Sequence, residues 1–137
     1  MNGGDQNVKF GWDHAHFVCR DVDRMVRYFE KVFGAERVRE DANLRGARNI
    51  TLRLGGCRLM VRSTRTGEAF DAQGPRLVEG LDHLGLSVDD LKAACPVLKE
   101  RGAKFIVEPS AGVGGRLIAF VEGPENIRIE LCEPMKG

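Results

Sequence analysis

The chain has 137 residues, of which 42% are hydrophobic and 30% are charged, a composition typical of a globular domain rather than of a disordered segment. Its formal net charge of +1 provides no overall attraction for nucleic acids or for anionic membrane surfaces. No apolar run reaches the ~18 residues that a membrane-spanning helix needs. The N-terminal residues are polar and Gly-rich, so we expect a flexible segment rather than a signal peptide, and therefore a cytoplasmic protein with reduced cysteines.

An internal repeat organises the sequence. Residues 13–22 read Asp-His-Ala-His-Phe-Val-Cys-Arg-Asp-Val and match residues 82–91, Asp-His-Leu-Gly-Leu-Ser-Val-Asp-Asp-Leu, at an offset of 69 residues without a gap. Each copy continues into a helical pattern that ends at a Gly-Ala pair, and then into three strand-like segments. The repeat therefore predicts an α+β fold of two βαβββ modules. We expect a single domain over 12–137, with modules at 12–62 and 81–133, a linker at 63–80 and flexible residues at 1–11.

Capping and spacing signals define the helices of both modules. Asp21 and Asp90 are good N-caps, and an apolar stripe at helical spacing follows each of them. Gly34 and Gly102 provide left-handed stops. Pro96 lies inside the second helix, where it removes a backbone hydrogen bond or bends the axis. After the opening strands we expect helices over 22–33 and 91–101, strands over 36–40, 50–54, 57–62, 104–107, 117–121 and 127–132, and an irregular stretch over 41–49.

Strand alternation gives each module an apolar face and a polar face. The pair Gly55-Gly56 suits a two-residue hairpin, in which Thr51 pairs with Met60 and Arg53 pairs with Arg58. The side chains expected under the helices then include Leu52, Leu54, Cys57, Leu59, Val61, Ile127, Ile129 and Leu131. The opposite face holds all three histidines of the protein and one carboxylate, namely His14, His16, His83 and Glu130.

This polar face has the composition of a metal site. His14 and His83 occupy equivalent positions in the repeat, so they approach each other if the modules pair about a pseudo-twofold axis. Neutral imidazoles beside a carboxylate, here Glu130, are typical ligands of divalent metals. Met60 stands where the repeat would place a second carboxylate, and we expect this soft thioether to line the pocket rather than bind metal. The alternative is that the histidines are unrelated surface or core residues.

The sequence resembles the vicinal oxygen chelate superfamily, which includes glyoxalase I, methylmalonyl-CoA epimerase, extradiol dioxygenases, fosfomycin-modifying enzymes and bleomycin-binding proteins. The resemblance is carried by Asp-His-Ala-His at 13–16, by the segment at 82–90, and by Gly-Pro-Glu-Asn-Ile-Arg-Ile-Glu-Leu at 123–131. It extends over nearly the whole chain.

The resemblance implies a half-open barrel, the cup of this superfamily, around one divalent ion (Fe, Mn, Zn or Ni). The matching positions make His14, His83 and Glu130 the ligands. A homodimer is implied as well, and a second chain would cover the exposed strand edges. Glyoxalase I and the epimerase carry a fourth ligand where this chain has Met60, whereas the extradiol dioxygenases and the fosfomycin enzymes use three ligands.

The implied function is that of an enzyme that chelates a small substrate through two adjacent oxygens. The reaction is either oxygenation with ring cleavage or glyoxalase-type lyase or isomerase chemistry, and the sequence leaves both open. His16, on the same strand face as His14, and Glu130 are the candidate acid–base groups. The alternative is a metal-free protein that binds and sequesters a small molecule such as a drug. Such a protein needs no ligand triad, so the presence of His14, His83 and Glu130 disfavours this alternative.

The distribution of arginines indicates the charge of the substrate. Between residues 37 and 65 there are eight arginines and two acidic residues. Arg53, Arg58 and Arg62 fall on the polar face with Met60, and these four are the candidate substrate-binding residues. Because arginine binds carboxylate or phosphate bidentately, they favour an anionic small molecule, with neither nucleic acid nor membrane as a partner. The alternative is a set of solvated or interface-paired charges.

Overall fold

The computed structural model describes residues 9, 12–70, 81–112 and 115–134. Of the expected flexible N-terminus (1–11), all residues except 9 lie outside the described residues, and so do residues 71–80 of the expected linker. The described part contains two four-stranded mixed sheets and two α-helices. Neither described helix is long and apolar enough to cross a membrane.

Each half of the repeat forms one sheet. The first module consists of β1 (His14–Val18), α1 (Val22–Phe33), β2 (Glu36–Leu44), β3 (Ala47–Leu54) and β4 (Cys57–Arg62). The second consists of β5 (Leu84–Ser87), α2 (Leu91–Glu100), β6 (Lys104–Ala111), β7 (Leu117–Glu122), the short 3-10 helix η3 (Pro124–Asn126) and β8 (Arg128–Cys132). The strand orders are β1-β4-β3-β2 and β5-β8-β7-β6, and in each sheet the first pair is parallel and the others are antiparallel.

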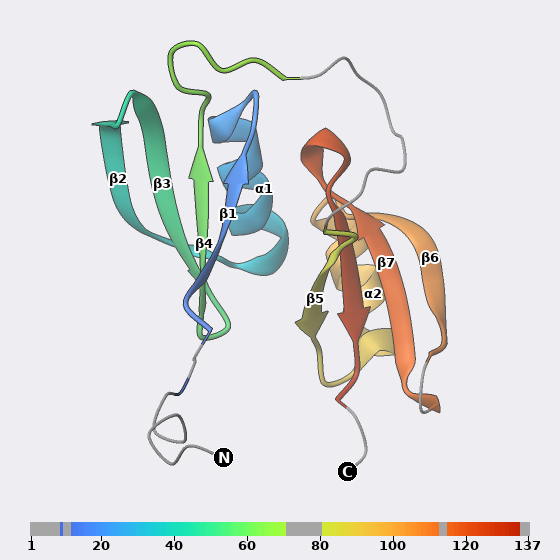
Figure 1. Ribbon diagram of the computed structural model, residues 1–137. Helices are drawn as coiled ribbons and strands as arrows, with labels where there is room; N and C mark the ends of the chain where they lie inside the picture. The colour runs from blue at the N-terminus through green and yellow to red at the C-terminus, as the bar shows by residue number, and fades with distance from the viewer. Residues whose placement is uncertain (1–8, 10–11, 71–80, 113–114, 135–137) are drawn as a thin grey trace, which may run out of the picture.

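The two sheets stand side by side, and each helix lies behind its own sheet in the view of Figure 1. The buried residues of both modules form one hydrophobic cluster, which includes the apolar faces of α1 and α2. This arrangement confirms the predicted α+β fold of two βαβββ modules that form an open cup rather than a closed barrel. We call the sheet face that is turned away from the helix the inner face.

The helix ends follow the predicted capping chemistry. The side chain of Asp21 accepts a hydrogen bond from the backbone N–H of Arg24, and that of Asp90 accepts one from Ala93. Gly34 ends α1 in the left-handed conformation, with φ 71°. Pro96 lies inside α2, which ends at Glu100, one residue earlier than expected.

The prediction of an irregular stretch over 41–49 is wrong, because strands cover most of it. Strand β2 continues to Leu44, β3 begins at Ala47, and Arg45 and Gly46 form the turn with φ 54° and 85°. Likewise, β6 runs to Ala111 rather than ending at residue 107. Both strands are largely exposed and contain register shifts against their partners, so their side chains lack the apolar alternation that reveals a strand in a sequence.

The predicted hairpin register is confirmed. Thr51 pairs with Met60 and Arg53 pairs with Arg58 across β3 and β4. The alternate residues point the other way and are buried under the helices, as are their counterparts in the second module. This buried set comprises Ile50, Leu52, Leu59, Val61, Val121, Ile129 and Leu131.

The two modules are tied together beside the first turn of α1. Glu125, in η3, adopts a left-handed conformation with φ 55°, which is unfavourable for a residue with a side chain. Its carboxylate accepts hydrogen bonds from the backbone N–H groups of Arg20 at 2.7 Å and Asp21 at 3.0 Å. At the other end of α1, Arg101 Nη1 donates to the carbonyl of Val32 at 3.2 Å. These contacts fix α1 against the second module.

The register has a direct consequence for stability. Leu52 is fully buried, so we expect Leu52→Ala to lower the free energy of unfolding by about 2–5 kcal/mol. Thr51→Ala, the adjacent change on the inner face, serves as the control and costs less than about 1 kcal/mol. Urea denaturation of the two variants measures the difference. Equal losses would contradict the assignment of the two faces.

Candidate metal centre on the inner faces

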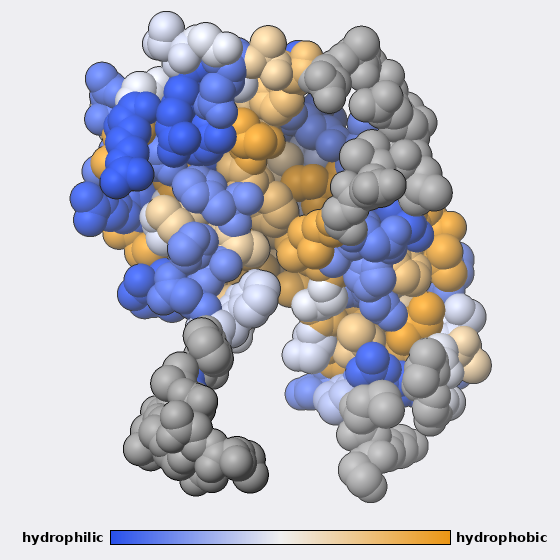
Figure 2. All heavy atoms as spheres, in the orientation of Figure 1, coloured by the Kyte–Doolittle hydropathy of each residue, from blue (hydrophilic) through white to orange (hydrophobic). Residues whose placement is uncertain are grey.

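The inner face of the first sheet carries three rows of side chains across β1, β4 and β3. These rows are His14, Arg58 and Arg53; His16, Met60 and Thr51; and Val18, Arg62 and Asn49. Both histidines of this module thus point to the inner face, as predicted. Figure 2 shows hydrophilic side chains gathered over this sheet.

The inner face of the second sheet carries Glu130 beside apolar side chains, with Glu122 and Arg128 in the row beyond it. Gly85, Glu130 and Phe120 form a row across β5, β8 and β7, and His83 lies just before β5. The ring of His83 contacts Phe120 edge-on, with the ring centroids 5.2 Å apart. Ile118 lies beside Cys132 in the next row.

The two equivalent histidines are held in the same way. Nδ1 of His14 lies 2.7 Å from Oδ2 of Asp13, and Nδ1 of His83 lies 2.7 Å from Oδ2 of Asp82. These hydrogen bonds lower the pKa of both aspartates, which therefore stay ionised and can only accept. Nδ1 therefore donates to the aspartate in each case, and Nε2 is the ring atom that faces any other partner. A carboxylate that orients a histidine in this way is typical of metal-binding histidines.

His83 and Glu130 form the nucleus of a cation site. Nε2 of His83 lies 2.9 Å from Oε2 of Glu130, and the Glu130 side chain is only 19% exposed. At this distance the two atoms share a hydrogen bond, and a divalent cation can take the place of the shared proton. The donor set of an imidazole nitrogen and a carboxylate oxygen therefore fits a divalent ion.

The third predicted ligand does not join this pair within one chain. Among the described residues, no three His, Cys, Asp or Glu side chains are arranged to hold a metal ion. His14 remains on the first sheet, where its nearest aromatic neighbour is His16, with the ring centroids 6.1 Å apart. The structure thus brings together two of the three predicted ligands and keeps His14 apart from them.

His16 is anchored by a residue that the sequence analysis missed. Its Nε2 lies 3.1 Å from Oδ1 of Asn49, which is buried on β3. Burial is the largest influence on the pKa of His16 and lowers it, while the Asn49 hydrogen bond opposes this and the charge of Arg62 adds to it. The imidazole is therefore neutral near pH 7. The sequence signal for Asn49 was weak, because it is one of several polar residues in β3 and shares a face with Thr51 and Arg53.

The three predicted substrate-binding arginines differ in their surroundings. Arg53 pairs with Glu36 at 2.7 Å, and Arg62 pairs with Glu68 at 2.7 and 3.0 Å. Arg58, beside His14 in the register, makes no ion pair within the described part of the chain. Of the three, Arg58 is therefore the one whose charge the described acidic residues leave available to an anion.

Comparison with known proteins identifies the class of protein. The sequence model of the Glyoxalase/Bleomycin resistance protein/Dioxygenase superfamily matches residues 11–131, and the chain belongs to this superfamily. The lactoylglutathione lyase of Escherichia coli O157:H7 is 26% identical over 121 residues, which cover 88% of this chain and 90% of that protein. A protein of Synechocystis sp. described as "Probable lactoylglutathione lyase" is 36% identical over 58 residues, and the match spans 42% of this chain and 44% of that relative.

Solved structures agree with this assignment. The glyoxylase/bleomycin resistance protein/dioxygenase domain from Frankia sp. EAN1pec superposes with a TM-score of 0.74 at 23% identity, covering 95% of this chain and 96% of the other. At this identity the likeness establishes the shared fold.

The Arg62–Glu68 pair gives a prediction about pH. Hydrogen bonds from Arg62 and from the backbone of Arg65 lower the pKa of Glu68 to about 2. Because this pKa lies below its unfolded value, the contact stabilises the fold above the ordinary glutamate pKa of about 4.3 and is lost as the pH falls toward 2. We expect a carboxyl-carbon NMR titration of Glu68 to show this low midpoint, and Arg62→Gln to move it toward the ordinary value. An unchanged midpoint in the variant would contradict the assignment.

Proposed function

We propose that this protein is a metal-dependent enzyme of the glyoxalase type, with His14, His83 and Glu130 as the ligands of one divalent ion. The observation that carries the proposal is the pair of equivalent Asp–His contacts, at 2.7 Å each, together with the His83–Glu130 contact at 2.9 Å. Both histidines turn Nε2 away from their aspartate, and Nε2 of His83 lies 2.9 Å from a carboxylate oxygen of Glu130. Chance surface histidines have no reason to share this orientation.

We further propose that two subunits of a homodimer share each site. Within the described residues of one chain His14 is not grouped with His83 and Glu130, so a second copy is the natural source of the missing ligand. The inner faces also expose apolar side chains, such as Val18 at 44%, which a second sheet would cover. Each site then takes His14 from one subunit and His83 with Glu130 from the other.

The substrate in this proposal is a small molecule with two adjacent oxygens, one of which lies next to a carbon-bound proton. A bound divalent ion supplies Lewis-acid stabilisation of the negative charge that develops on those oxygens. His16 stays neutral near pH 7 and can accept the proton, while Asn49 fixes its ring. Glu130 is the second candidate for proton transfer, and Arg58 holds an anionic group of the substrate.

The similarity to lactoylglutathione lyases supports lyase or isomerase chemistry over oxygenation. These relatives are named for a lyase reaction, and proton transfer beside a chelated oxygen needs an acid–base group but no dioxygen. Met60 lies beside His16 on the inner face, where it shapes the pocket rather than binding metal.

Metal content of purified, reconstituted variants tests the ligand set. We expect His83→Ala to lower metal affinity by more than about tenfold, because it removes a ligand. Met60→Leu should leave metal binding unchanged, because it keeps the volume and removes only a weak donor. Met60→Glu should tighten Zn or Ni binding by adding a carboxylate. Full binding by His83→Ala, or metal loss in Met60→Leu, would overturn the proposed ligands.

Mixing two inactive variants tests the shared site. His14→Ala and His83→Ala are each expected to lack metal, but a heterodimer of the two contains one site with all three ligands. Co-expression with different affinity tags should therefore restore about a quarter of the parent metal sites, since about half of random dimers are mixed and each holds one intact site of two. No restoration in confirmed heterodimers would show that each site lies within one chain. A parent protein that stays metal-free after reconstitution would instead support the sequestering function.

A further inference from the structure

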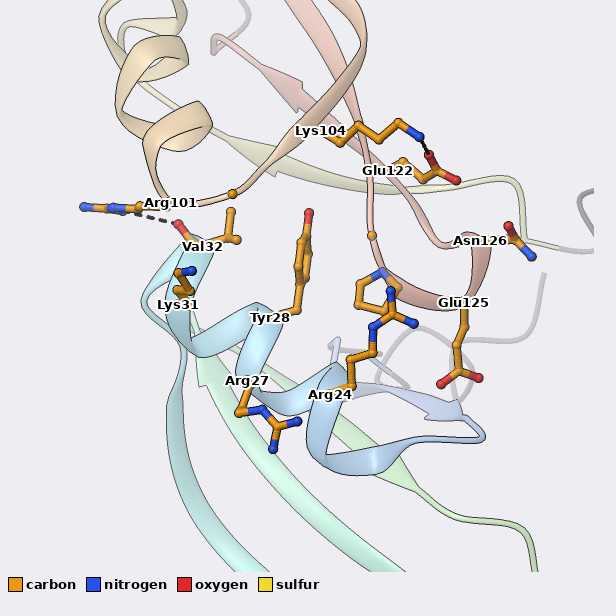
Figure 3. A pocket seen from close by; sticks show the side chains of 13 residues that line it. Arg24, Arg27, Tyr28, Lys31, Val32, Arg101, Lys104, Glu122, Glu125 and Asn126 are labelled. Carbon is orange, nitrogen blue, oxygen red and sulfur yellow. Dashed lines mark hydrogen bonds and ion pairs between the residues drawn. The ribbon is translucent and has the colours of Figure 1, made fainter.

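A cavity of about 790 Å³ lies at the junction of the two modules, away from the candidate metal ligands. Its walls come from α1, from the end of α2 and the start of β6, and from the connection between β7 and β8 (Figure 3). Four basic side chains line it without an ion pair to any described acidic residue: Arg24, Arg27, Lys31 and Arg101. The first three follow one face of α1 at helical spacing.

The acidic residues of the cavity do not neutralise these charges. Glu122 pairs with Lys104 at 2.9 Å, and Figure 3 shows this pair extending away from α1. The carboxylate of Glu125 already accepts two backbone hydrogen bonds, from Arg20 and Asp21. Four unpaired positive charges against one negative charge leave an excess of three in a protein whose net charge is +1. The four basic side chains are exposed to solvent, so an anion can reach them and is attracted by all of them.

A buried donor without a partner points to the same kind of ligand. The hydroxyl of Tyr28 is buried and has no hydrogen-bond partner among the described residues. Its ring rises from α1 toward β7 in Figure 3, and Gly123 lies so near that an added Cβ would sit 3.4 Å from the ring. Burial raises the pKa of Tyr28 to about 12, so the hydroxyl keeps its proton and can donate.

We propose that this junction cavity binds a multiply charged phosphate compound, with two or more linked phosphates. Guanidinium groups bind phosphate oxygens bidentately, and an excess of three positive charges matches a diphosphate better than a single phosphate. The walls belong to both modules, since Lys31 lies near Gly102 and Arg101 bonds to the carbonyl of Val32. A bound diphosphate therefore stabilises the present packing of α1 on the second module. This site is independent of the proposed metal chemistry.

Calorimetric titration with inorganic pyrophosphate tests the proposal, on metal-stripped protein in chelator-treated buffer, so that the result does not depend on the metal site. We expect saturable binding with one site per chain, at least about tenfold tighter than orthophosphate, and a rise in the melting temperature with pyrophosphate concentration. ADP and inorganic tripolyphosphate, titrated in parallel, distinguish a nucleotide from a free polyphosphate as the preferred source of the linked phosphates.

Three variants decide which residues bind. Arg24→Gln/Lys31→Gln should weaken pyrophosphate binding by about tenfold or more, whereas Lys92→Gln, at the exposed start of α2 outside the cavity, should change it less than about twofold. Tyr28→Phe should weaken binding several-fold while leaving the unliganded protein as stable as the parent, because the lost hydroxyl has no described partner. Absence of parent binding, or equal weakening by the Lys92 and Arg24/Lys31 variants, would overturn the site. Full affinity in Tyr28→Phe would overturn the role of the hydroxyl.

Discussion

The inner faces depend on one constraint, the register of the hairpin between β3 and β4. Side chains alternate along a strand, so a slip of one residue would move the whole buried set to the other face. The two-residue turn at Gly55-Gly56 fixes this register by placing Thr51 opposite Met60. Burial of Leu52 and Val61 under α1 then stabilises that register and no other. Because β1 pairs with β4, the same register also places His14 and His16 on the inner face. The position of the candidate site therefore follows from core packing.

The two modules share some features of the candidate site and differ in others. Each module has an aspartate that orients a histidine, which is the symmetric part. The modules differ in one row of the inner face. In the first module this row contains His16 and Met60, and in the second it contains Gly85 and Glu130. The first half therefore offers two imidazoles but no counterpart of Glu130, and the second offers one imidazole whose Nε2 faces Glu130. Each half is complete only with the other, which is the chemical basis for proposing a shared site.

The junction between the modules is fixed by contacts of Glu125 and Arg101 with the two ends of α1. Glu125 accepts backbone hydrogen bonds at the start of α1 although its own backbone is in an unfavourable conformation. This contact holds α1 against the second module. The basic side chains Arg24, Arg27 and Lys31 of α1 and the side chain of Arg101 then line the same cavity. Contacts that fix the relative position of two modules thus also create the cationic cavity between them.

The sequence by itself determined the two-module fold, the helix caps at Asp21 and Asp90, and the face of each strand, because these depend on local spacing and on the repeat. It missed the full length of β2, whose exposed side chains show no apolar alternation, since only the hydrogen-bond ladder to β3 defines that strand. Its metal ligands remain a prediction, with their orientation now explained by Asp13 and Asp82. The anchoring of His16 by Asn49, the neutralisation of Arg62 by Glu68 and the junction cavity were decided by tertiary structure alone. His16 and Asn49 are 33 residues apart, and the cavity walls come from both modules, so only tertiary packing brings them together. Arg62 and Glu68 are six residues apart, but Glu68 follows the end of β4 in a segment without regular structure, so no spacing rule predicts their contact.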